Sequence, residues 1–138
     1  MTSSNYDDKE EKVTGGRNGF GAKLANIFSK KFIIETGSSK MKKHYTQSFY
    51  DNMTRKEEPI ITKVDHGDFT CIKFFPDLTR FNMTRLDPDI VALFTKRAYD
   101  MAGCTDSKVK VFINGNQIGI KNFSDYVDLY LKNEEAKT

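Results

Sequence analysis

Residues 13–24 read VTGGRNGFGAKL, a stretch that places four glycines, an Arg and a Lys directly before an amphipathic helical pattern. Glycine has no Cβ, so the backbone N–H groups of such a loop can approach and surround an anion. A helix that starts at the end of the loop adds unpaired N–H groups and the positive end of its dipole. With Arg17 and Lys23 as cations, the stretch has the parts of a phosphate-binding loop.

The loop departs from two common nucleotide-binding motifs. In a P-loop, GxxxxGK[ST], the Lys follows the second glycine directly, whereas here Ala22 separates Gly21 from Lys23, and Leu24 replaces the hydroxyl residue. A dinucleotide-binding loop reads GxGxxG after a strand, whereas this order is GxxGxG after a polar segment. Spacing alone leaves two interpretations open, a phosphate-binding loop and a flexible connector that caps a surface helix.

The composition is typical of one soluble globular domain. The chain has 138 residues, of which 38% are hydrophobic and 30% are charged. It lacks the roughly 20-residue apolar run of a membrane helix and begins without a secretory signal, so we expect an intracellular protein with no membrane partner. Cys71 and Cys104 are expected to be reduced. The net charge of +3 permits an anionic ligand without requiring one.

Hydrophobic periodicity predicts an α+β fold with the order helix, strands, helix, strands, helix. Helices are expected at residues 18–29, 87–103 and 123–131. Strands are expected at residues 32–36, 43–51, 69–75, 108–113 and 117–120, with tight turns at 38–42 and 114–115.

Local signals predict how the second and third helices begin. Asp87 is expected to cap the second helix, with Pro88 as its first residue, and Ser124 is expected to cap the third. The second helix has an apolar face that is expected to pack against a sheet. That face consists of Ile90, Leu93, Phe94, Ala98 and Met101.

Several motifs together resemble the ATPase region of eukaryotic DNA topoisomerase II, a member of the GHKL ATPase superfamily. TSSNYDD at residues 2–8 precedes VTGGRNGFGAKL, and NIFS follows at residues 26–29. The likeness continues through SFYDNM, DFTCIKFFPDL, LDPDIVALFTKRAYDMAG, VKVFINGN and YVDLYL, over nearly the whole chain. Phe20 is a departure, because the family usually has Tyr there, and the change removes a hydroxyl group.

The resemblance implies a fold and a division into domains. It implies part of a GHKL-type sandwich, in which helices pack on a mostly antiparallel sheet. Residues 1–16 would form a loop that closes over the nucleotide, residues 17–120 the C-terminal part of the GHKL ATPase domain, and residues 121–138 the start of the transducer domain.

The resemblance also implies the residues that bind ATP. The triplet that contacts the ribose and phosphates would be Ser3, Ser4 and Asn5. The loop that wraps the triphosphate would be Gly16, Arg17, Asn18, Gly19, Phe20, Gly21, Ala22 and Lys23. In the family, the general-base Glu, the Asn that binds Mg²⁺ and the Asp that reads adenine lie before this stretch, and a Lys in a QTK motif lies after it. No catalytic or metal-binding residue is therefore assigned to this chain.

The implied activity belongs to a nuclear, homodimeric enzyme that uses ATP to pass one DNA duplex through a transient double-strand break in another. This chain would supply the phosphate-binding loop and would not hydrolyse ATP alone. A second hypothesis is a stand-alone, non-catalytic, truncated relative that binds nucleic acid or a protein through a basic hairpin. That hairpin carries Lys40, Lys42, Lys43 and His44.

Overall fold

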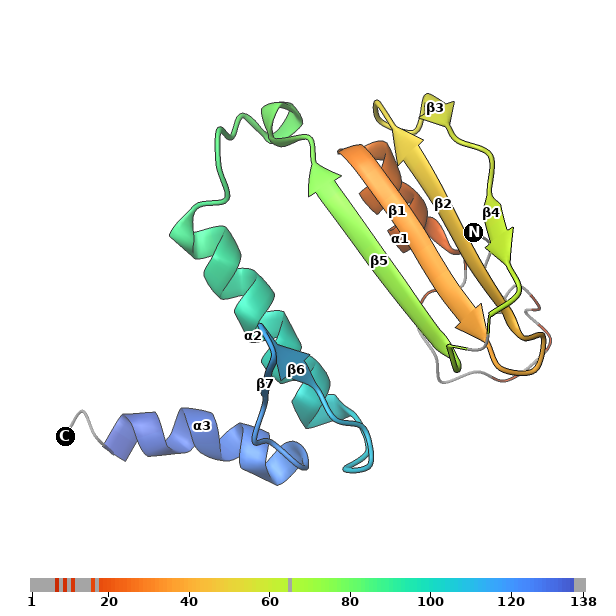
Figure 1. Cartoon of the computed structure of the whole chain (residues 1–138). Helices are drawn as coiled ribbons and strands as arrows, with labels where there is room; N and C mark the ends of the chain where they lie inside the picture. The colour runs from red at the N-terminus through yellow and green to blue at the C-terminus, as the bar shows by residue number, and fades with distance from the viewer. Residues whose placement is uncertain are drawn as a thin grey trace. The chain divides into compact units, whose positions relative to one another are not determined.

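The computed structural model of the chain describes residues 7, 9, 11, 16, 18–64 and 66–135. The chain divides into two compact units, Met1–Thr84 and Arg85–Thr138, and each is described by itself (Figure 1). Within the described ranges, no helix combines the length and the apolar character that a bilayer crossing requires. The domain boundaries expected near residues 16 and 120 stay predictions.

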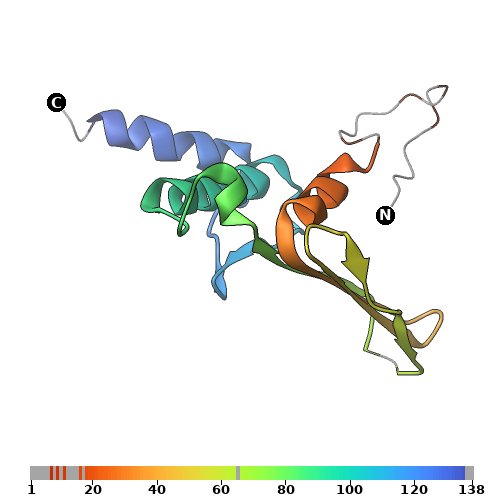
Figure 2. The ribbon, with the colours of Figure 1, turned by 90° about the horizontal axis from the view of Figure 1, so that it is seen from above.

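The first unit is a short helix on an antiparallel sheet. The sheet has the order β3-β2-β1-β5, with β4 also paired to β2. Helix α1 packs against β1 and β5 and lies along one face of the sheet (Figure 2). The elements are α1 (Phe20–Ile27), β1 (Ser29–Ser38), β2 (Lys43–Tyr50), β3 (Arg55–Lys56), β4 (Ile60–Thr62), β5 (Phe69–Pro76) and the 3₁₀ helix η1 (Leu78–Phe81).

The predicted hairpin and third strand are confirmed, and β1 is longer than expected. Because β1 pairs with β2 on one side and with β5 on the other, its ladder extends over ten residues. This central position buries Phe32, which lies opposite Phe49 in the register with the two rings 6.4 Å apart. The two rings form the buried apolar centre of the sheet.

The carboxylate of Asp77, just after β5, is 3% exposed and surrounded by polar partners. Its Oδ1 accepts a hydrogen bond from Thr79 Oγ1 (2.7 Å), and its Oδ2 accepts one from Asn52 Nδ2 (3.1 Å). The Lys30 Nζ and Arg80 Nε atoms lie 3.1 and 3.3 Å from Oδ2. Hydrogen bonds, that of Thr79 first, lower the pKa of Asp77 to about 2, although burial acts in the opposite direction.

This pKa predicts acid sensitivity of the first unit. Because the folded pKa lies below the ordinary value of 3.8, the charged Asp77 stabilises the fold above that value, and the stabilisation is lost as the pH falls towards about 2. We expect Asp77→Asn to lower the urea midpoint of unfolding at neutral pH. Between pH 4 and 2, we expect this midpoint to decrease less in the variant than in the wild type. Circular dichroism measures both. Glu58→Gln, at an exposed side chain, serves as control. Identical pH profiles for wild type and Asp77→Asn would contradict this account.

The second unit contains two helices and a small hairpin. Its elements are α2 (Pro88–Cys104), β6 (Phe112–Ile113), β7 (Asn116–Gln117) and α3 (Phe123–Glu135). Asp87 Oδ1 accepts the Ile90 N–H at 2.9 Å, so the predicted cap is confirmed. The turn between β6 and β7 has Asn114 at φ 48° and Gly115 at φ 81°, the left-handed pair that a tight hairpin needs.

Two local predictions for this unit are wrong. The cap of α3 is Asn122, whose Oδ1 accepts the Asp125 N–H at 2.9 Å, so Ser124 lies inside the helix. An Asn at this position competes well with Ser as a cap, and the sequence signal did not separate the two. The strands of the hairpin are also shorter than expected, because only Phe112 with Gln117 and Ile113 with Asn116 pair.

The expected burial of the apolar face of α2 is wrong as well. Leu93, Phe94 and Met101 are 47%, 52% and 54% exposed. Within its own unit α2 packs against α3 and β6, and its buried residues are Ala102 and Gly103. A hairpin of two-residue strands offers too little surface to cover a helix of 17 residues.

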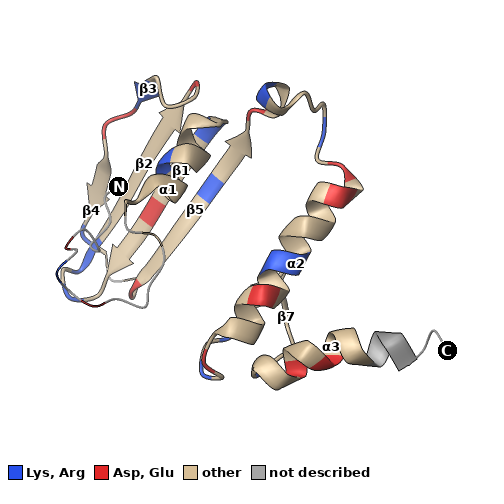
Figure 3. Ribbon diagram, turned by 180° about the vertical axis from the view of Figure 1, so that it is seen from behind, with Lys and Arg blue, Asp and Glu red and all other residues tan. Residues whose placement is uncertain are grey.

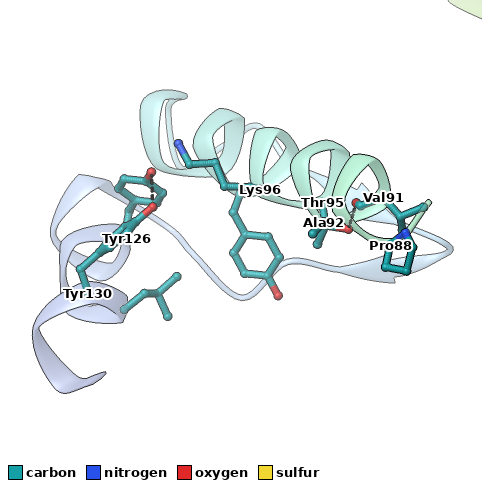
Figure 4. A pocket seen from close by; sticks show the side chains of 9 residues that line it. Pro88, Val91, Ala92, Thr95, Lys96, Tyr126 and Tyr130 are labelled. Carbon is teal, nitrogen blue, oxygen red and sulfur yellow. Dashed lines mark hydrogen bonds between the residues drawn. The ribbon is translucent and has the colours of Figure 1, made fainter. Parts of the chain in front are cut away.

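Helices α2 and α3 meet through Tyr126, beside a groove of about 560 Å³ that also exposes Lys96 and Tyr130 (Figure 4). Tyr126 donates a hydrogen bond to Asp100 Oδ1 at 2.6 Å, which raises the pKa of the phenol. The close approach depends on Gly103. A Cβ at this position would lie 2.7 Å from the Tyr126 Cβ and Cγ atoms.

Gly103→Ala is therefore expected to destabilise the second unit. The better helix propensity of Ala offsets part of the cost of overpacking, which leaves a net loss of about 1–2 kcal/mol. Hydrogen exchange of the α2 and α3 amides measures the effect. Gly119→Ala is the matched control, because a Cβ there meets no atom within 4 Å. Equal protection in the two variants would show that the contact has no energetic role.

Candidate phosphate-binding site

Helix α1 begins with a glycine in a conformation that few other residues adopt. Gly19 is the N-cap of the helix, at φ 66° and ψ 20°, in the left-handed region. Gly16, earlier in the loop, also has a positive φ of 75°. The helix starts at Phe20, two residues later than the sequence predicted, because Gly19 turns the chain into it.

The first turn of α1 has no side-chain cap and no acidic residue. Among the described residues, no side chain caps the N–H groups of Phe20, Gly21 and Ala22, which also have no acceptor within the helix. A Cβ built on Gly16 or on Gly21 meets no atom within 4 Å. The start of α1 thus combines a glycine cap with main-chain N–H groups that point out of the helix, an arrangement that suits an anion.

Lys23 adds a full positive charge to the first turn. Its Nζ lies 5.9 Å from the centre of the Phe20 ring, a cation–π distance. In the part of the chain that the structure describes, no carboxylate forms an ion pair with Lys23. The Phe20 ring is 59% exposed and belongs to the surface beside the loop. Lys23 can therefore contact an anionic ligand without breaking an ion pair within these residues.

The structure describes most of the predicted binding residues. Those at the N-terminal end of α1 are Gly16, Asn18, Gly19, Phe20, Gly21, Ala22 and Lys23. Ser3, Ser4, Asn5 and Arg17 lie outside the described residues. Among the described residues, no group of three or more His, Cys, Asp or Glu side chains is placed to hold a metal ion.

The other end of α1 is fixed by hydrogen bonds from the sheet. Asn52, in the turn after β2, donates from Nδ2 to the carbonyl of Ile27 at 2.9 Å and to Asp77 Oδ2 at 3.1 Å. Ser29, at the start of β1, donates its hydroxyl hydrogen to the Ala25 carbonyl. These bonds hold the helix axis and, with it, the direction of the N–H groups at its start.

Sequence reasoning did not identify Asn26 as a buried polar residue of this helix. Its side chain is 1% exposed, and neither Nδ2 nor Oδ1 has a hydrogen-bond partner among the described residues. An unsatisfied buried amide costs about 1–3 kcal/mol. The available signal was its position between the apolar residues Leu24 and Ile27 of an amphipathic helix.

Comparison with known proteins gives consistent results. The chain is 56% identical over 138 residues to DNA topoisomerase 2-alpha of Sus scrofa, a match of 100% of this chain and 9% of the relative. It is 58% identical over 132 residues to DNA topoisomerase 2 of Arabidopsis thaliana, a match of 95% of this chain and 9% of the relative. The chain therefore spans about a tenth of the length of these curated relatives.

A solved structure extends the comparison to the fold. The crystal structure of the ATPase region of Saccharomyces cerevisiae topoisomerase II matches with a TM-score of 0.91 and 49% identity. The match covers 96% of this chain and 35% of the solved chain. No protein-family model matches the sequence.

Proposed function

Because this chain belongs to the ATPase region of the eukaryotic DNA topoisomerase II family, we propose that its glycine loop binds the phosphates of ATP. The identities and the structural match confirm the family resemblance and the α+β fold that the sequence indicated. A stand-alone, non-catalytic relative is not favoured, since the match to these enzymes extends over 95% or more of the chain.

One observation carries the proposal: the first turn of α1 is capped by a glycine and not by a side chain. Main-chain N–H groups there can donate to phosphate oxygens, and the missing Cβ atoms of Gly16 and Gly21 leave room for them. Lys23 would neutralise charge on the β- and γ-phosphates through a charge-assisted hydrogen bond.

The remaining predicted contacts complete the proposed site. Hydroxyl and amide groups of Ser3, Ser4 and Asn5 suit the oxygens of the ribose and the phosphates. Arg17 and Asn18 stand beside the glycines in sequence and would add a cation and an amide donor. Mg²⁺, when bound with the nucleotide, would supply further charge neutralisation, and we assign its ligand and the general base to segments other than these residues.

For the longer protein, we propose the activity that the names of its relatives describe. ATP binding would bring two copies together, and DNA would be the substrate whose topology changes by passage of one duplex through a transient double-strand break. The catalytic Tyr of that break would lie in another domain. We further propose that the protein is nuclear. We also propose that residues 1–16 close over the nucleotide, that residues 17–120 belong to the GHKL ATPase domain, and that residues 121–138 begin the transducer domain.

Two variants test the phosphate loop. We expect Lys23→Ala to weaken binding of a non-hydrolysable ATP analogue about tenfold or more, since a charged hydrogen bond is lost. We expect Gly21→Ala to leave the fold intact, because a Cβ there meets no atom, and to weaken binding because it fills the space proposed for a phosphate. Calorimetric titration into the chain measures both, with thermal unfolding as the test of folding.

Gly119→Ala is the matched control for Gly21→Ala, because it adds a methyl group in equally open space in the second unit. Unchanged affinity in Gly119→Ala together with reduced affinity in Gly21→Ala supports a phosphate beside Gly21. Equal affinities in wild type, Lys23→Ala and Gly21→Ala would refute the loop as the binding site.

A further inference from the structure

A second cationic surface lies at the tip of the β1–β2 hairpin. Lys42 and Lys43 of the tip and Lys63, just after β4, line one groove of about 330 Å³. Met41 and Val64 form its apolar part and are 63% and 39% exposed. We call these five residues the lysine groove. Figure 3 shows basic residues at this hairpin tip.

The three ammonium groups of the lysine groove have no carboxylate partner among the described residues. Elsewhere in the chain, Lys30, Lys73 and Lys96 each lie within 3.3 Å of an Asp or Glu oxygen. Like charges that share one groove repel each other, and the attraction of each to an anion bound between them offsets this repulsion. The lysine groove therefore differs from the sites of Lys30, Lys73 and Lys96, and it gathers three such unpaired ammonium groups in one place.

Among the described residues, the carboxylate of Asp68 is attached to the same hairpin tip, and it has a structural role. Asp68 Oδ1 accepts the backbone N–H of Ser39 at 2.8 Å, and this bond lowers the pKa of Asp68. Asp68 thus stays charged and compensates part of the positive potential. The lysines of the groove, together with the exposed Lys40 in the same turn, outnumber it.

Hydrogen bonds fix the backbone of the turn that carries Lys42. Lys42 has φ 48°, in the left-handed region that side-chain-bearing residues seldom adopt. Its N–H donates to the Ser39 carbonyl at 3.3 Å, and the Met41 N–H donates to Ser38 Oγ at 3.3 Å. A preformed turn reduces the conformational entropy that is lost when a ligand binds.

We propose that the lysine groove contacts the phosphate backbone of duplex DNA, at a site separate from the glycine loop. Lysine binds phosphates as a point charge, and contacts to phosphates position a protein without reading sequence. The groove carries no Arg, Asn or Gln, the residues that form paired hydrogen bonds with base edges, so its binding is expected to be independent of sequence. The choice of DNA as the polyanion rests on the proposed function.

The test is a triple variant of the whole 138-residue chain, Lys42→Gln with Lys43→Gln and Lys63→Gln. Fluorescence anisotropy with a labelled duplex of about 20 base pairs measures affinity between about 50 and 200 mM KCl, without nucleotide. Each lost phosphate contact reduces the slope of log K against log salt by about 0.9. We expect the slope to fall by nearly three such steps, and the affinity at low salt to fall at least tenfold.

A matched variant removes the same charge from the second unit, at Lys108, Lys110 and Lys121, each to Gln. We expect its salt slope to stay close to that of the wild type. Equal losses in both triple variants would overturn the proposal, because they would reflect net charge alone. Absence of DNA binding by the wild-type chain would also overturn it.

Two further measurements separate the remaining explanations. Vesicles containing phosphatidylserine test a lipid surface, and binding to them that depends on the three lysines, with DNA binding unchanged, would overturn the proposal in favour of a membrane partner. Titration of the ATP analogue into the lysine-groove variant is expected to match the wild type. A failure of the glycine loop to bind the analogue would thus be distinguishable from a failure of the groove to bind DNA.

Discussion

A buried carboxylate must be surrounded by donors and cations, and Asp77 obtains them from segments that are far apart in the sequence. Its backbone N–H also donates to the Phe28 carbonyl at 2.8 Å, where α1 passes into β1. Asn52 links the same carboxylate to the carbonyl of Ile27 at the last turn of the helix. Because a helix of eight residues is not stable alone, its direction depends on these bonds, and the position of the glycine loop depends on that direction.

Among the described residues, α1 begins differently from α2 and α3, and the difference bears on function. Asp87 caps α2 and Asn122 caps α3, each with a side-chain oxygen on a backbone N–H. Glycine in place of such a cap costs only a few tenths of a kcal/mol, and α1 has Gly19 at this position. Among the described residues, side chains therefore cap α2 and α3, whereas α1 has a glycine cap without a side-chain hydrogen bond. An anionic ligand would replace the missing cap, which connects a local loss of stability to the proposed binding of phosphates.

The features that could be predicted from the sequence are those set by neighbouring residues. The Asp87 cap, the Asn114–Gly115 turn and the glycine loop each depend on a few consecutive side chains, and the motifs of the loop also indicated the family. The partners of Asp77 could not be predicted, because Asn52 lies 25 positions away and only the folded sheet brings the two together. The prediction that the apolar face of α2 is buried was wrong for a related reason. Periodicity identifies an apolar face but does not specify which element covers it.

Many apolar side chains of the described residues are exposed to solvent. Among the described residues, the buried hydrophobic side chains are Phe32, Phe49, Ala102 and Ile118, whereas Phe74 and Phe75 of β5 are 50% and 55% exposed. A chain that matches 35% of a solved ATPase region is expected to expose surface that the remainder of that region would cover. Hydrogen bonds and ion pairs between polar side chains then fix the relative positions of elements that a small hydrophobic core cannot fix. Asp77 does so in the first unit, and the bond from Tyr126 to Asp100 does so in the second.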